Sequence, residues 1–199
     1  LNAIQKQVEQ KDIFISSTGI ALVVLVSVLV LYLLFLKDHK ALKENHNKHI
    51  LFLFLGLILY LAFTKLAVYI AQSTAPQAAW DLSSISFFMA IPIPAAAMLT
   101  CLFLGFDIAI VFGIILSLLV SLSFSGSLEV FVYFFLSCSS AAYLIKEQQE
   151  RTIFIIAGFK LAAFNALLAL SLGFYSLAQP DVMVILKEMA MAFCGGVFA

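Results

Sequence analysis

The sequence predicts an all-α protein: a polytopic transmembrane helical bundle with six complete helices and a truncated seventh. Two observations carry this prediction. Hydrophobic residues make up 64% of the chain and charged residues only 11%, whereas a soluble domain is about half apolar and about a quarter charged. The apolar residues also form runs of about 20, the length that an α-helix needs to cross a bilayer. A soluble core cannot hold that much apolar surface, but lipid can surround it.

Polar and charged stretches separate the apolar runs and divide the chain into elements. Residues 1–12 are polar, and we expect them to be the juxtamembrane tail of an upstream extracytoplasmic domain, so that the membrane domain covers 13–199. Tight turns are expected at 105–107 and 125–127, and a charged loop at 146–151. The expected spans are 13–36, 50–71, 84–105, 108–124, 128–145, 152–177 and a seventh that begins near 183 and is cut at Ala199.

The distribution of basic residues predicts the orientation in the membrane. The loops on one side hold Lys37, Lys40, Lys43, Lys48, Lys146 and Arg151. The opposite side holds only Lys6, Lys11 and Lys187. Because cytoplasmic loops carry an excess of Lys and Arg, we expect the N-terminus outside and the seventh helix leading into the cytoplasm.

Pro92 and Pro94 interrupt the third expected span. Each proline lacks a backbone N–H and clashes with the preceding helical turn. The segment from Pro94 to Gly105 is too short to cross a bilayer alone at ~1.5 Å per residue, so the helix must kink or break here. A break at membrane depth is tolerated only where it is buried or lines a cavity. A ligand pocket, a moving hinge and a simple packing kink all remain open.

The sixth expected span carries a stripe of small residues and two polar residues. The stripe consists of Gly158, Ala162, Ala166 and Ala169. Small residues at helical spacing let helix backbones approach each other closely. Asn165 shares this face, where it is expected to hydrogen-bond to a neighbouring helix or, in a second interpretation, to contact a ligand. Lys160 lies on another face. Two interpretations are open: it is a functional charge within the membrane, or its stem reaches toward the membrane interface.

No catalytic, cofactor-binding or metal-binding residue is predicted. Cys101, Cys138 and Cys194 lie inside apolar segments without a metal-ligand spacing. The histidines at 39, 46 and 49 alternate with lysines in a polar loop that we expect to be solvated. Nucleotide-binding and hydrolase motifs are absent from the sequence, and a net charge of zero gives no sign of a nucleic-acid partner. Water should solvate Glu129 and Glu188 near the outer helix ends.

Two segments are similar to a known family. The stretch IPIPAAAML at 91–99 resembles a motif in the third helix of the seven-transmembrane HD-domain receptors, which are bacterial membrane phosphohydrolases. The stretch from Leu144 to Gly173 is similar to the sixth helix of that family. The resemblance implies an extracytoplasmic sensor domain before Leu1 and a cytoplasmic HD phosphohydrolase after Ala199. The hydrolase metal would be held by His and Asp residues outside this chain, and some family members hydrolyse cyclic di-AMP.

Three functions are therefore open. The first is a sensor and transducer domain in the bacterial cytoplasmic (inner) membrane that couples an external signal to cyclic-dinucleotide hydrolysis. The second is a small-solute transporter or its membrane-embedded binding subunit, which would use the helix break at Pro92 and Pro94 and a polar site near the bilayer midplane with Lys160 and Asn165. The third is a passive anchor, with the small-residue stripe as the contact of a homo-oligomer.

Overall fold

A computed structural model describes residues 26, 29, 46–74, 88–124, 126–146, 151–176 and 182–199. Within these residues the chain is helical and contains no β-strand. The helices are α2 (His46–Thr74), α4 (Pro94–Leu104), α5 (Phe106–Ser123), α6 (Leu128–Ile145), α7 (Arg151–Ser176) and α8 (Val182–Val197). The prediction of an all-α protein is confirmed for this part of the chain.

The chain divides into two compact units, Leu1–Ile50 and Leu51–Ala199. Helix α2 begins in the first unit and continues into the second, and the packing described below belongs to the second unit. The expected tail at 1–12 lies outside the described residues. So does the first expected span at 13–36, except for Val26 and Leu29, which are helical and exposed.

Three helices in the described residues are long and apolar enough to cross a membrane. They are Phe106–Ser123, Leu128–Ile145 and Ile155–Tyr175, and they correspond to the fourth, fifth and sixth expected spans. The stretches Leu51–Ala67 and Pro94–Leu104 are shorter apolar helices. The full count of six complete spans and a truncated seventh therefore remains a prediction.

The two tight turns form where the sequence predicts them. Gly105 adopts a φ of 95° between α4 and α5, and Gly126 adopts a φ of 74° between α5 and α6. Glycine has no Cβ and enters this left-handed region without steric cost. The second turn is also held by the Ser121 hydroxyl, which donates to the Ser127 carbonyl oxygen at 2.6 Å.

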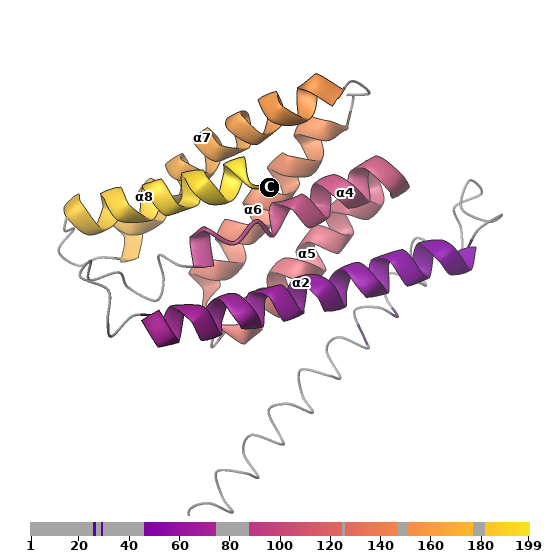
Figure 1. Cartoon of the computed structure of the whole chain (residues 1–199), viewed down its shortest axis with the longest axis horizontal. Coiled ribbons are helices and arrows are strands. Elements are labelled where there is room, and N and C mark those ends of the chain that lie inside the picture. Colours follow the sequence, from indigo (N-terminus) through magenta and orange to yellow (C-terminus); the bar gives the residue numbers. More distant parts are fainter. Residues whose placement is uncertain are drawn as a thin grey trace, which may run out of the picture. The chain divides into compact units, whose positions relative to one another are not determined.

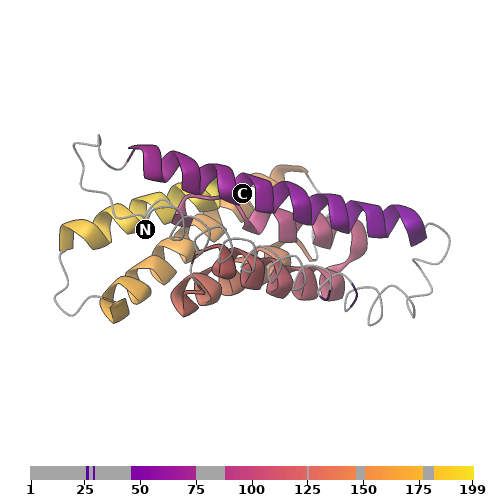
Figure 2. The same cartoon turned by 90° about the horizontal axis from the view of Figure 1, so that it is seen from below.

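Helices α4, α5 and α6 pack on one another, and α7 packs on both α6 and α8 (Figure 1). The view from below again shows α7 and α8 side by side (Figure 2). Tyr133, Phe112 and Phe134 are the largest fully buried side chains of the described core. A Cβ added to Gly113 on α5 would lie only 3.1 Å from the Cys138 Cβ on α6, so these two helices approach closely.

Three buried hydroxyl groups are satisfied inside their own helices. Thr64, Thr100 and Ser117 each donate to the carbonyl oxygen four residues earlier, at 2.8, 2.8 and 2.7 Å. No buried side-chain nitrogen or oxygen of the described residues lacks a hydrogen-bond partner. This arrangement suits a hydrocarbon environment, where an unsatisfied polar group costs several kcal/mol.

Candidate functional site at a helix break

The helix that leads into α4 is broken between Ala90 and Ile93. Phe88 and Met89 are helical, the next four residues form a turn and a bend, and α4 begins at Pro94. The Ile93 N–H donates to the Ile91 carbonyl oxygen at 2.8 Å. In an uninterrupted helix it would donate to Met89, four residues earlier. The prolines thus produce a break rather than a kink, and the break releases the Met89 carbonyl group.

Tyr133 on α6 binds the released carbonyl group. Its hydroxyl donates to the Met89 carbonyl oxygen at 3.2 Å, and its side chain is only 1% exposed. Next to this bond, the ring of Phe88 packs against Phe124 and Phe134, with centroid distances of 5.1 and 6.2 Å. The break is therefore anchored to α6 by one hydrogen bond and one aromatic cluster.

Two consecutive glycines bring α8 onto the same segment. A Cβ on Gly195 would overlap the Met89 carbonyl oxygen and lie 3.1 Å from the Ala90 backbone. A Cβ on Gly196 would overlap the Ala162 Cα and lie 2.6 Å from its nitrogen. Both glycines are buried within α8, near its C-terminal end. Gly195 faces the break and Gly196 faces α7. The backbone of the last turn of α8 therefore contacts the backbones of both the break and α7.

Sequence reasoning missed these two glycines as functional residues. A signal was present, because glycine in a helix interior costs about 1 kcal/mol relative to alanine and usually has a packing or functional reason. The partner of each glycine could not be identified from the sequence. Met89 and Gly195 are far apart along the chain, and only the packing of α8 brings them together.

The four candidate residues named from the sequence lie in three different places. Pro92 and Pro94 form the break, and Pro94 is buried. Asn165 is 1% exposed in the interface of α6 and α7, where its side-chain oxygen accepts a hydrogen bond from the Ser137 hydroxyl at 2.6 Å. Lys160 is exposed on α7. The structure thus joins α8 to the Met89–Ala90 segment that precedes the two prolines, and it leaves Asn165 and Lys160 outside this site.

The small-residue stripe of α7 packs within the chain. Gly158 lies opposite the end of α8, where an added Cβ would be 3.6 Å from the Val197 carbonyl oxygen. Ala162 meets Gly196, as described above, and Ala169 is fully buried. The close approach predicted for this face is therefore made by α7 and α8 of one chain.

Charged groups do not form a metal site in the described residues, where no group of three His, Cys, Asp or Glu side chains lies together. The expectation that water solvates Glu188 is wrong, because this residue is only 6% exposed. Gly173 on α7 leaves room for its carboxylate, with a carboxylate oxygen 3.4 Å from the position of an added Cβ.

Apolar helices of membrane-spanning length, together with a buried proline break, define a helical membrane protein. The comparison with protein families identifies the class more closely. The sequence matches the family described as 7TM receptor with intracellular HD hydrolase over residues 14–199, and the chain belongs to this family. The resemblance inferred from residues 91–99 is thereby confirmed. No curated protein and no solved structure matches the chain.

Proposed function

We propose that this chain is the transducer domain of a bacterial inner-membrane receptor, in which the packing of α8 on the helix break couples an extracytoplasmic signal to a cytoplasmic HD phosphohydrolase. An upstream sensor domain delivers the signal, and α8 leads to the hydrolase, whose substrate is a cyclic dinucleotide such as cyclic di-AMP. Family membership supports the receptor and the HD domain. The contact between α8 and the break supports the coupling.

The observation that carries the proposal is the backbone contact between Gly195 and the Met89–Ala90 segment. No side chain lies between them to absorb a displacement, so a movement of the break presses directly on the last turn of α8. The same carbonyl group holds α6 through Tyr133. Tightly packed interfaces of this kind switch between discrete arrangements rather than deforming continuously. A signal that favours one arrangement shifts the population of both elements together.

The contacts at the helix ends agree with the proposed orientation. The Lys146 ammonium group at the end of α6 lies 4.7 Å from the ring centroid of Phe106, the first residue of α5. The turn between α4 and α5 and the end of α6 at Lys146 are therefore at the same end of the helices. The basic residues assign both to the cytoplasm.

The transporter alternative requires a polar cavity at midplane depth. One cavity of the described residues, between α2, α4 and α5, is lined mostly by apolar side chains, and Asn165 is bonded to Ser137, so neither feature supports a solute site. The anchor alternative predicts that an unrelated membrane anchor preserves regulation. The transducer proposal predicts that regulation is lost after such a replacement.

The proposal is tested with Gly195→Leu in the full-length protein that carries this domain. The new side chain must displace the break, so we expect cyclic di-AMP hydrolysis in membranes to lose its dependence on the sensor domain. Ala190→Leu is the matched control, since it adds the same side chain at an exposed position of α8.

Tyr133→Phe provides a second, milder variant that removes only the hydroxyl group. If both Gly195→Leu and Tyr133→Phe insert normally and respond to sensor deletion as the wild type does, the break does not transmit the signal.

A further inference from the structure

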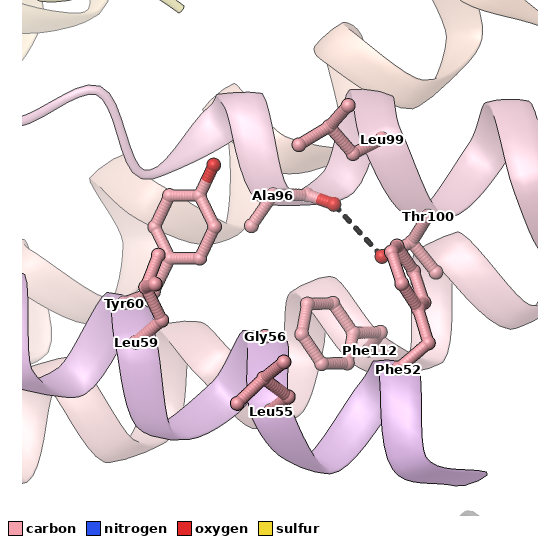
Figure 3. A pocket seen from close by; sticks show the side chains of 9 residues that line it. All are labelled: Phe52, Leu55, Gly56, Leu59, Tyr60, Ala96, Leu99, Thr100 and Phe112. Carbon is pink, nitrogen blue, oxygen red and sulfur yellow. Dashed lines mark hydrogen bonds between the residues drawn. The ribbon is translucent and has the colours of Figure 1, made fainter. Parts of the chain in front are cut away.

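The second unit contains an apolar cavity of about 200 Å³ between α2, α4 and α5. Phe52 and Tyr60 stand at its two ends on α2 (Figure 3). Eight residues separate them, which corresponds to about 12 Å along a helix. The cavity is therefore elongated along α2 over roughly two helical turns.

Small residues create this space. Gly56 on α2 has no side chain, and the position of an added Cβ would still be 3.9 Å from the Phe112 ring. Ala96 on α4 is buried and faces the cavity. At one end, the rings of Phe52 and Phe103 meet edge to face with centroids 5.4 Å apart. That contact holds α2 against α4 there, and the cavity lies along the helices beyond it.

The floor of the cavity, where Ala96, Thr100 and Phe112 lie, offers no group that requires water, and the Tyr60 hydroxyl lies at one end of the cavity. Thr100 is the polar residue of the floor, and its hydroxyl donates to the Ala96 carbonyl oxygen at 2.8 Å, as Figure 3 shows. An engineered apolar cavity of about 150 Å³ in another protein stays dry and binds benzene or xenon. The cavity here is open on one side, and its mostly apolar lining likewise suits an apolar guest.

The cavity opens on a surface rich in leucine. Leu55 and Leu59 are each 59% exposed, and Leu99 is 44% exposed. In a membrane protein of this family, leucines exposed on the apolar stretches Leu51–Ala67 and Pro94–Leu104 face the hydrocarbon of the bilayer. The molecules that reach this opening directly are therefore lipid acyl chains. Because Gly56 and Ala96 are small, an unbranched methylene chain would be able to lie against the backbones of both helices. A branched or charged molecule would instead meet the three leucines around the opening, which form the leucine rim.

We propose that this cavity binds a lipid acyl chain, which inserts between Leu55, Leu59 and Leu99 and lies along α2 from Phe52 to Tyr60. The contacts are dispersion contacts with the floor, and the headgroup remains outside. This inference goes beyond the transducer role and does not rest on it.

The experiment uses the full-length protein in nanodiscs of phosphatidylethanolamine and phosphatidylglycerol. Part of the phosphatidylglycerol carries a diazirine near the end of one acyl chain. After irradiation, labelled residues are identified by mass spectrometry. The leucine rim is exposed to bulk lipid and is labelled whether or not an acyl chain enters the cavity. Labelling of the floor residues therefore tests the proposal. Thr100 and Phe112 are only 2% and 1% exposed, and we expect both to be labelled.

Ala96→Phe fills the cavity from α4 and Gly56→Val fills it from α2. We expect either variant to abolish labelling of the floor while labelling of the rim persists. Leu167→Phe, at an exposed position of α7, is the control and should leave the floor labelled. Labelling confined to the rim would overturn the proposal. So would saturable binding of fluorobenzene, followed by ¹⁹F NMR, in the absence of floor labelling, because the guest would then be a compact molecule.

Discussion

Removal of one hydroxyl group tests how the break is held. In Tyr133→Phe the ring remains, but the Met89 carbonyl oxygen loses the hydrogen bond that α6 supplies. The Ile93 N–H cannot replace it without refolding the turn, because it is bonded to the Ile91 carbonyl oxygen. The phenylalanine variant therefore leaves a buried carbonyl group without this partner, and we expect the protein to lose stability.

The geometry of the bond sets the magnitude. An oxygen–oxygen distance of 3.2 Å is longer than the usual 2.7–2.8 Å or so for a hydroxyl donor, so the lower part of the range for buried hydrogen bonds applies. Interhelical hydrogen bonds in membrane proteins contribute about 0.6 kcal/mol on average and up to about 1.7 kcal/mol. We therefore expect a loss of about 0.5 kcal/mol, which lowers the midpoint of thermal unfolding by about 1–2 °C in a chain of this size.

The assay is thermal unfolding of the purified protein in one detergent, with Tyr143→Phe as the matched control. Tyr143 lies on the same helix but is 70% exposed, so removal of its hydroxyl should leave the midpoint unchanged. The reasoning is refuted if both variants unfold at the same temperature, or if Tyr133→Phe is as stable as the wild type.

Three further predictions concern α7 and use the same unfolding measurement. Gly196→Ala forces a Cβ onto the backbone of Ala162, so it should cost about 1–3 kcal/mol; unchanged stability would mean that α7 and α8 do not approach so closely. Asn165→Ala and Ser137→Ala each remove one partner of a buried hydrogen bond and should cost about 1 kcal/mol. In a double-mutant cycle their losses should not add, and additive losses would contradict the bond. Lys160→Gln alters an exposed side chain and should change stability by less than about 0.5 kcal/mol; a larger loss would reveal a buried role for the lysine.

The break and the turns could be predicted because they depend on local chemistry. Pro92 and Pro94 lack N–H groups wherever the rest of the chain lies. Gly105 and Gly126 supply the left-handed backbone that a tight turn needs. Long apolar runs likewise predict membrane helices from composition alone. These features needed no knowledge of the packing, and the helical class and the turns followed from them.

The contacts that give the break a partner could not be predicted in this way. Gly195 meets Met89 only because α8 folds back across α7, and no local pattern encodes that path. Glu188 shows the same limit. Its position near a helix end predicts solvation, but packing against Gly173 buries it. Sequence reasoning therefore identified the broken element of the candidate site and missed the helix that contacts it.

Transmission of the signal from the break to α8 is tested most directly with Pro92→Ala/Pro94→Ala, a double variant that restores the two missing N–H donors and allows a continuous helix. The proposed cyclic di-AMP hydrolysis by the full-length protein is measured in membranes, with and without the proposed sensor domain. We predict that sensor deletion changes the activity of the wild type but no longer changes that of the double variant. A double variant that responds to sensor deletion as the wild type does would contradict the role of the break in signalling.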